Sequence, residues 1–258
     1  MKGVAAVVVG YNPDIQVLDS LLASLVDQVD LLVLVDNGGA SLFLESSPTI
    51  RDRIRYIPLG ENKGLGFALN IGFSCAIDEG NDYVVTFDQD SHAQSDLIST
   101  LHQAMCKAKL MDGNAIAVSP TFFDRRDGKQ IKFPFYSSSS GAIRAIFQSD
   151  DEHGLVKADA LITSGMLVDT RAWKKGIKYD DGMFVDFTDT EWCFRVRDRG
   201  FSLYGCLKVE MGHALSDAPP VKILGLSFFR YSPVRRYFFF RNTDRKSTRL
   251  NSSHHPDL

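Results

Sequence analysis

The chain has 258 residues, of which 44% are hydrophobic and 24% are charged, and its formal net charge at pH 7 is -3. These values are typical of an ordinary globular protein with one large α/β domain or two small ones, and they give no overall attraction to nucleic acid. The four cysteines form no CxxC pair, which indicates reduced thiols and argues against a disulfide framework or a zinc site.

No targeting or membrane segment is apparent in the chain. The N-terminal residues lead directly into a short apolar run and lack the long apolar core and cleavage site of a signal peptide. No stretch reaches the roughly 18 apolar residues of a membrane span. We therefore expect a cytoplasmic protein.

A βαβ unit is predicted at the start of the chain. Val4–Val9 is a continuous apolar run, typical of a buried parallel strand. Apolar residues then recur at helical spacing from Ile15 to Val29, and Leu31–Val35 is a second buried strand. Such units are almost always right-handed with parallel strands. Asp36 should therefore lie at the same sheet edge as the turn after the first strand, as either a simple turn residue or a ligand of a ribose or base.

A glycine-rich segment follows the next short strand, Ile54–Ile57. It runs from Gly60 to Asn70 and leads into a helix that continues to Ile77. Glycines before a helix allow backbone amides to approach a ligand, and the helix dipole favours anions. A flexible loop with a good cap would show the same composition. The segment lacks the lysine and serine that end a P-loop, so it is not one.

The strand Asp82–Phe87 ends in two aspartates, Asp88 and Asp90, which are separated by one residue. Carboxylates so close repel each other unless they share a cation or a proton. Mg²⁺ commonly takes one or two carboxylates together with substrate phosphates. The pattern therefore indicates either a site for a metal-bound diphosphate or an acidic turn that caps the next helix. A helix from Leu97 and a strand at Ala115–Ser119 then complete an α/β pattern, which predicts a mostly parallel sheet flanked by helices.

The second half contains another cluster of chemically useful side chains. A strand broken at Gly165 precedes a predicted helix that Thr188 or Asp189 would cap and that would run to Arg199. An oriented carboxylate such as Asp189 suits a general base, although plain capping explains it too, and the same two interpretations apply to Asp186. His213 follows a predicted strand, either as a structural residue or as a ligand of metal or phosphate.

Taken together and in order, these motifs resemble the inverting glycosyltransferases of family 2, which have the GT-A fold, and among them the bacterial rhamnosyltransferases that use dTDP-rhamnose. The resemblance covers residues 3 to about 242. The matching segments are Val9–Pro13, Val35–Asn37, Glu61–Gly64, Ala68–Gly72, Phe87–Ser91, Asp189–Arg195 and His213.

The resemblance implies roles for the residues of the first half. Tyr11, Asp36 and Asn62 would line the nucleotide pocket. Asp88 would contact the ribose or the phosphates of the nucleotide. The two halves of a single GT-A domain would then be residues 1–119, which bind the nucleotide sugar, and residues 120–218, which bind the acceptor and carry the base.

The resemblance also implies where the metal and the base lie. Asp90 would bind Mg²⁺ or Mn²⁺ on the diphosphate, and His213 would assist that metal–diphosphate. Asp189 would deprotonate the acceptor hydroxyl. Thr188 stands where many family members carry an acidic residue immediately before the base.

The expected function is transfer of a sugar, L-rhamnose from dTDP-rhamnose, onto a saccharide or lipid-linked saccharide during surface polysaccharide synthesis. Three alternatives remain. The first is a glycosyltransferase with another nucleotide-sugar donor, and the second is a haloacid-dehalogenase-like phosphohydrolase, whose nucleophile motif also ends a strand with Asp-x-Asp. The third is a truncated protein that binds a nucleotide sugar without turnover. The sequence indicates no oligomeric state.

Two segments complete the chain. Residues 219–243 interleave aromatics with arginines, which suits peripheral contact with an anionic membrane surface, although a helix packed on the domain fits equally well. Residues 244–258 lack an apolar period and resemble translated sequencing-adapter sequence, so this tail is expected to be non-native and without function.

Overall fold

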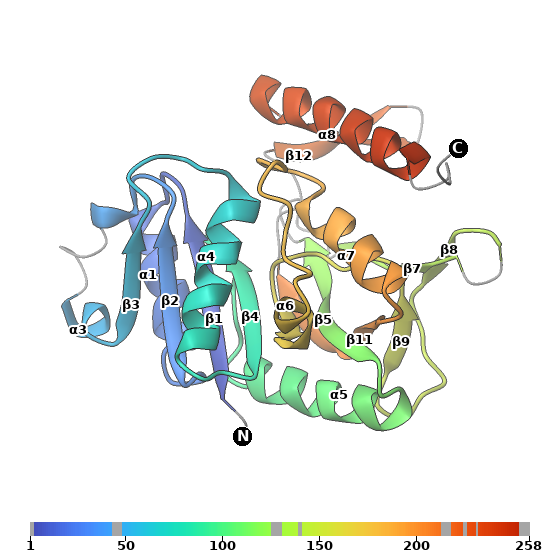
Figure 1. The fold of residues 1–258 in the computed structure, drawn as a ribbon, viewed down its shortest axis with the longest axis horizontal. Coiled ribbons are helices and arrows are strands. Elements are labelled where there is room, and N and C mark those ends of the chain that lie inside the picture. The colour runs from blue at the N-terminus through green and yellow to red at the C-terminus, as the bar shows by residue number, and fades with distance from the viewer. Residues whose placement is uncertain are drawn as a thin grey trace.

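A nine-stranded sheet organises the computed structural model, which describes residues 3–42, 48–124, 131–138, 141–212, 218–223, 226–230 and 232–252 (Figure 1). The strands are β1 Val4–Gly10, β2 Leu31–Asp36, β3 Ile54–Pro58, β4 Tyr83–Asp88, β5 Ala115–Asp124, β6 Ile131–Lys132, β7 Phe135–Ser137, β8 Arg144–Ile146, β9 Leu155–Ala158, β10 Met166–Asp169, β11 Ser202–Gly212, β12 Ala218–Ile223 and β13 Leu226–Arg230. The helices are α1 Ile15–Leu25, the 3₁₀ turn η1 Ala40–Leu42, α3 Pro48–Arg51, α4 Leu65–Asp78, α5 Leu97–Met111, α6 Arg171–Lys174, α7 Thr188–Asp198 and α8 Pro233–Ser252.

The main sheet is mostly parallel, as the sequence predicts. Its strand order is β3-β2-β1-β4-β10-β5-β11-β9, with β6 paired to β5. Strands β1 to β5 and β11 run in one direction, whereas β6, β9 and β10 run in the other. Strand β10 separates β4 from β5, so two strands that are consecutive along the first half do not pair. The local pattern of apolar residues did not indicate this insertion.

Helices cover both faces of the sheet because the buried strands carry apolar side chains on both sides. In β1, Val4, Ala6 and Val8 pack with α1 and α5, whereas Ala5, Val7 and Val9 pack with α4, α6 and α7. A strand that alternates between two covered faces reads as a continuous apolar run. The run at Val4–Val9 was interpreted in that way, and the structure confirms it.

The second half departs from the expected elements in three places. The strand predicted around Gly165 forms only after that residue, where the backbone has a φ of +71° that glycine adopts readily. Helix α7 ends at Asp198 and has no side-chain cap, because its N-cap residue is Phe187, whose ring has no hydrogen-bond acceptor. The predicted capping by Thr188 or Asp189 was therefore wrong. The aromatic and basic segment forms part of a hairpin, β12–β13, and then α8, whose side chains contact the residues just before α7 (Figure 1).

Two further predictions concern the whole chain. Cys75, Cys106, Cys193 and Cys206 are all free thiols, as their scattered positions indicate. Within the described ranges, no helix is both long and apolar enough to cross a bilayer.

Candidate active site

The carboxyl ends of four parallel strands bring the predicted residues of the first half to one edge of the sheet. Gly10 at the end of β1 pairs with Asp36 at the end of β2, and Asp36 pairs with Pro58 at the end of β3. On the other side of β1, Val9 pairs with Asp88 at the end of β4. Ligands of open α/β sheets bind at this edge. Tyr11, Asp36 and Asp88 therefore share one end of the molecule although they are far apart in sequence.

Asp36 is buried, and its carboxylate holds the turn after β2. Its Oδ1 accepts hydrogen bonds from the backbone amides of Gly38, at 2.8 Å, and Ala40, at 3.0 Å. Its Oδ2 accepts one from the hydroxyl of Tyr56 at 2.5 Å. Burial, together with this hydrogen bond and the negative charge of Asp36, raises the pKa of Tyr56 well above its ordinary value. Both oxygens of Asp36 thus shape the loop, while its contact with a nucleotide stays a prediction.

Asn62 forms a pair with Asn37 that joins the glycine-rich segment to the end of β2. The Asn62 Oδ1 accepts from Asn37 Nδ2 at 3.0 Å and from the amide of Gly64 at 2.9 Å. The Asn37 Oδ1 in turn accepts from the amide of Lys63 at 2.8 Å. Asn37 is only 4% exposed, and sequence reasoning assigned it no role in the site. Its position directly after Asp36 was the available signal.

Gly64 and Gly66 allow the backbone of this segment to pack closely against the backbone before α7. A Cβ at Gly64 would lie 2.9 Å from the Cα of Phe184, and one at Gly66 would lie 2.7 Å from the carbonyl oxygen of Asp180. Between them, the amide of Leu65 donates to the carbonyl of Phe184 at 2.7 Å. The segment before α4 is therefore in contact with the chain that leads to α7, which gives these glycines a structural reason beyond anion binding.

The side chain of Gln89, which lies between Asp88 and Asp90, forms two hydrogen bonds with the turn after β1. Its Oε1 accepts from the amide of Tyr11 at 2.6 Å, and its Nε2 donates to the carbonyl of Tyr11 at 3.1 Å. The ring of Tyr11 remains 49% exposed and available to a ligand. Sequence reasoning missed Gln89 because no local pattern predicts that a glutamine in a turn will contact a residue 78 positions earlier in the chain.

Asp88 and Asp90 differ in their surroundings. Asp88 is half-buried at the end of β4, and its amide donates to the Oγ of Ser164 at 3.3 Å. Asp90 is exposed and has no hydrogen bond or ion pair with any residue that the structure describes. Among these residues no three acidic, histidine or cysteine side chains gather as a metal site. One or two carboxylates fit a cation that arrives with diphosphate oxygens and water, whereas a preformed cage would need more ligands.

His213 lies outside the described residues, so its contacts are not part of the structure. The residue before it, Gly212, ends β11 and forms an antiparallel bridge with His92. His92 comes two positions after Asp90 in the chain. The backbone that leads into His213 therefore passes beside the Asp88–Asp90 turn, and its role as a metal ligand stays a prediction.

The segment before β10 joins the end of β4 to Asp189. The hydroxyl of Thr86 donates to the carbonyl of Thr163 at 2.5 Å, and the hydroxyls of Ser164 and Ser91 are 2.5 Å apart. The amide of Thr163 also points to Oδ2 of Asp189 at 3.3 Å. Two consecutive residues, Thr163 and Ser164, thus contact both the strand that carries Asp88 and the helix that carries Asp189.

Asp189 is half-buried in the first turn of α7 and is equipped to act as a base. Its Oδ1 accepts from the amide of Thr190 at 2.7 Å, and its Oδ2 accepts from Thr163. Burial raises the pKa of the carboxyl although these hydrogen bonds oppose the shift. A carboxylate with a raised pKa accepts a proton more readily than an exposed one. Asp186, for which the same role was considered, instead forms an ion pair with Arg235 at 2.5 Å.

An aromatic cluster fixes α7 beneath this carboxylate. Trp192 is fully buried, and its Nε1 donates to the carbonyl of Ile177 at 3.0 Å. Its ring lies 5.6 Å from that of Tyr179. The hydroxyl of Tyr179 is buried and lacks a hydrogen-bond partner among the described residues. Burial, followed by the neighbouring groups of Cys193, Asp189 and Asp88, raises the pKa of Tyr179 well above its ordinary value.

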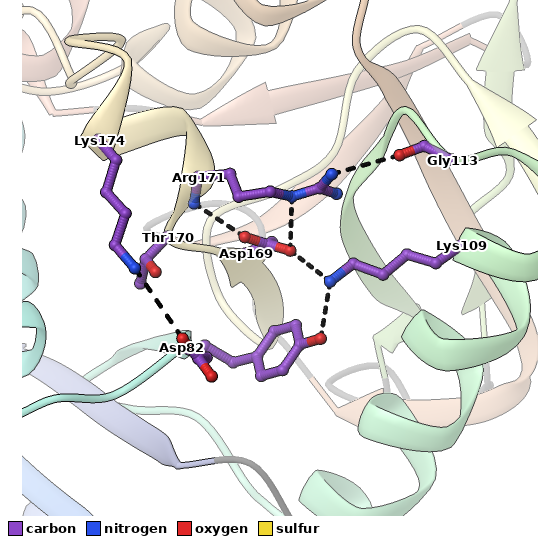
Figure 2. A pocket seen from close by; sticks show the side chains of 8 residues that line it. Asp82, Lys109, Gly113, Asp169, Thr170, Arg171 and Lys174 are labelled. Carbon is purple, nitrogen blue, oxygen red and sulfur yellow. Dashed lines mark hydrogen bonds and ion pairs between the residues drawn. The ribbon is translucent and has the colours of Figure 1, made fainter.

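A separate cavity of about 300 Å³ lies at the opposite edge of the sheet, where β4 begins (Figure 2). Asp169, which is 5% exposed, pairs with Lys109 and with Arg171, whose Nε lies 2.9 Å from its Oδ2. Lys174 lies 3.9 Å from Asp82. The three cations of this cavity therefore face two carboxylates of the protein itself, which is typical of a structural ion-pair network.

Comparison with known sequences agrees with the family that the sequence motifs resemble. Residues 6–164 match the profile described as "Glycosyl transferase family 2". The chain is 30% identical over 241 residues to the dTDP-rhamnosyl transferase RfbF of Shigella flexneri, an alignment that covers 93% of this chain and 78% of that protein.

Solved structures with a similar fold include the S. aureus protein TarS. TarS 1–349 in complex with UDP has a TM-score of 0.55 and 14% identity, with 83% of this chain and 61% of that chain covered. The complex with UDP-GlcNAc has a TM-score of 0.54 and 13% identity, with 84% and 59% covered. This chain thus spans less than two thirds of those structures, and at such identity the likeness concerns the fold.

Proposed function

Because the chain belongs to glycosyl transferase family 2, we propose that it transfers L-rhamnose from dTDP-rhamnose, with inversion, onto a saccharide or lipid-linked saccharide acceptor of surface polysaccharide synthesis. The family assignment and the GT-A fold expected from the sequence are confirmed. The name of RfbF as a dTDP-rhamnosyl transferase supports the choice of donor. The family does not favour a haloacid-dehalogenase-like phosphohydrolase or a protein without turnover.

One observation carries the proposed mechanism: the residues Thr163 and Ser164 contact both the end of β4 and the carboxylate of Asp189. An inverting transfer needs a base on the acceptor side and charge stabilisation on the diphosphate side of one sugar. Asp189 and the Asp88–Asp90 turn come from elements that are about 100 residues apart in sequence, and this segment supports their proximity.

The reaction that we propose is a single displacement. Asp189 accepts the proton of the acceptor hydroxyl while the oxygen of that hydroxyl bonds to the anomeric carbon of the sugar. The bond between that carbon and the diphosphate breaks, and its electron pair stays on the diphosphate oxygen. The raised pKa of Asp189 supports this assignment because the carboxylate is then a stronger base. Its position in the first turn of α7, near the positive end of the helix dipole, favours the ionised form that a base needs.

Mg²⁺ or Mn²⁺ fits the diphosphate side of the site. Asp90 would bind the cation, with Asp88 on the nucleotide ribose or phosphates and His213 as a further ligand. When bound, such a cation neutralises charge on the departing diphosphate. The exposure of Asp90 and its lack of a partner among the described residues support this role.

The nucleotide would lie against the loops at the ends of β1, β2 and β3. The exposed ring of Tyr11 and the side chain of Asn62 would contact it directly. Asp36 would line the pocket with them, and its two oxygens, which accept three hydrogen bonds, also hold the turn after β2. Residues 1–119 would form the nucleotide-sugar half of the domain, and residues 120–218 the acceptor half.

We place the enzyme in the cytoplasm, with peripheral contact at the inner face of the cell membrane through residues 219–243. In α8, Val234 and Tyr237 are each 62% exposed and Phe240 is 71% exposed, close to the exposed Arg236. Exposed apolar and basic side chains on one helix suit an anionic lipid surface. Residues 244–258 stay outside this proposal as an expected non-native tail.

A transfer assay tests the proposed function. The enzyme would be incubated with dTDP-rhamnose or UDP-glucose, with a rhamnose-containing acceptor, and with Mn²⁺ or EDTA. We expect dTDP release and product only with dTDP-rhamnose and Mn²⁺. A preference for UDP-glucose would mean that dTDP-rhamnose is not the donor. Release of phosphate from a simple phosphomonoester would favour the phosphohydrolase. Full activity in Asp88→Asn with none in Asp189→Asn would contradict the role of Asp88.

A further inference from the structure

The chain adopts an uncommon backbone conformation immediately before the helix that carries Asp189. Asp186 has a φ of 60° and Phe187 a φ of 63°, so two consecutive residues with side chains lie in the left-handed region. Such conformations are costly without glycine and persist only where the surroundings impose them. Phe187 is the residue before α7, and Asp189 is the second residue of that helix. The orientation of the first turn of α7, and with it that of Asp189, therefore depends on the contacts that hold residues 186 and 187.

Asn242 of helix α8 supplies the first of these contacts. Its side chain is fully buried, and its Nδ2 donates to the carbonyl of Val185 at 2.8 Å and to that of Asp186 at 2.9 Å. Its Oδ1 accepts from the guanidinium of Arg241 at 3.0 Å, which orients the amide. Both protons of one amide are thus used on two consecutive carbonyls of the left-handed turn.

Arg235 supplies the second contact from the same face of α8. Its Nη2 lies 2.5 Å from Oδ1 of Asp186 and its Nε lies 3.3 Å from Oδ2, which makes a two-point ion pair. Two points of contact fix the orientation of the carboxylate as well as its position. Phe238, one turn further along, stacks on Phe184 with ring centroids 4.6 Å apart. Helix α8 therefore contacts this turn through hydrogen bonds, an ion pair and a ring stack.

These contacts do not belong to the cores that hold the main sheet. The two hydrophobic clusters on its faces end at Met211 and contain no described residue of α8. Among the apolar side chains of α8, the partly exposed Phe239 also packs against Phe187 of this turn, with ring centroids 4.8 Å apart. Loss of Arg235 or Asn242 should accordingly disturb the turn before α7 much more than the sheet.

We propose that Arg235 and Asn242 are positioning residues for glycosyl transfer, which hold the turn Asp186–Phe187 so that Asp189 faces the acceptor. This inference rests on the proposed function, in which Asp189 is the base. It makes α8 a part of the acceptor side of the site. The sequence had indicated only a membrane-binding or packed helix there.

The test compares variants of the full chain in the transfer assay with dTDP-rhamnose and Mn²⁺. Asn242→Asp keeps the shape of the side chain and removes both amide donors, and Arg235→Gln removes the ion pair. Arg199→Gln is the matched control, because this arginine after the end of α7 is exposed. We expect kcat to fall about 100-fold in the first two variants, the size of loss that follows a misplaced catalytic group. The Kd of dTDP-rhamnose should stay unchanged in all three.

Two readouts separate positioning from a general loss of folded protein. A smaller folded fraction lowers the rate without moving the pH profile, whereas a displaced and better hydrated Asp189 should move the acidic limb to lower pH. Arg235→Lys, which retains the charge, should recover part of the lost kcat. Wild-type kcat in both Asn242→Asp and Arg235→Gln would overturn the inference, as would losses equal to that of Arg199→Gln.

The Asp189→Asn variant distinguishes the failure of this inference from that of the proposed function. Transfer that survives in Asp189→Asn would overturn the base itself, and the positioning argument with it. Transfer that is lost in Asp189→Asn but normal in the α8 variants would overturn only the positioning argument. Arg235 is partly exposed, so its variant should fold even if the buried Asn242→Asp does not.

Discussion

Replacing Gln89 by alanine should weaken donor binding although Gln89 is neither of the two aspartates of its motif. The side chain makes two hydrogen bonds to the backbone of Tyr11, at 2.6 and 3.1 Å, and so joins the end of β4 to the turn after β1. Without them, the Tyr11 turn and the Asp88–Asp90 turn become independent of each other. The nucleotide would then have to bring the two together when it binds.

The size of the effect follows from those two hydrogen bonds. Each contributes about 1 kcal/mol net, so the variant should lose about 2 kcal/mol of the free energy that orders the turn. If donor binding needs the ordered turn, the apparent Kd rises by the inverse of the ordered fraction, up to about 30-fold for about 2 kcal/mol. The kcat should change little, because Asp189 belongs to another element.

Isothermal titration with dTDP and Mn²⁺ measures the binding effect, and urea unfolding measures the stability. Gln16→Ala is the matched control, since Gln16 is exposed on α1 and its backbone amide, which the substitution retains, is what donates to Asp14 at the start of that helix. We expect the control to bind dTDP normally. An unchanged Kd in Gln89→Ala would refute these two hydrogen bonds as part of the donor site, whatever their effect on stability.

Three further predictions concern the base, the β2 turn and the glycine segment. Since Asp189 must be ionised to accept a proton and burial raises its pKa, the pH–rate profile should show kcat falling as the pH is lowered through a value above that of an exposed aspartate, and Asp189→Asn should show no measurable transfer at any pH. Tyr56→Phe removes the hydroxyl that donates to the buried Asp36 and should lower the free energy of unfolding in urea by about 1.5 kcal/mol; no change would mean that the two amides suffice. Gly64→Ala would place a Cβ 2.9 Å from Phe184 at a residue whose φ is +89°, so it should lower the free energy of unfolding by about 2 kcal/mol. Gly80→Ala, at a φ of +83° with open space around it, should lower that free energy by less, and the difference between the two variants is the part due to crowding.

Local patterns in the sequence were enough to predict the first half of the domain. Continuous apolar runs such as Val4–Val9 identified strands that are covered on both faces, and the helical spacing after Ile15 identified the connection between them. Because right-handed connections between parallel strands bring their carboxyl ends to one edge, Asp36 and Asp88 were each expected at that edge of the sheet. The register confirms that expectation.

Contacts between distant segments were beyond the reach of such patterns. Strand β10 inserts between β4 and β5, and Thr163 reaches Asp189, through pairings of residues that are 26 or more positions apart. Gln89 and Asn37 looked like ordinary turn residues, because nothing in a polar side chain tells which backbone amide it will meet. Asn242 gave no signal at all, since its partners at Val185 and Asp186 lie 57 and 56 residues away.

The sequence alone therefore determined which strands of the first half form, which edge of the sheet is expected to bind a ligand and which carboxylates belong to the family motifs. Periodicity and strand ends are local properties, so they can be read from neighbouring residues. The tertiary structure alone decided how those carboxylates are held. The left-handed turn before α7 is contacted by α8, a helix from a distant part of the sequence, and only the folded chain brings the two together.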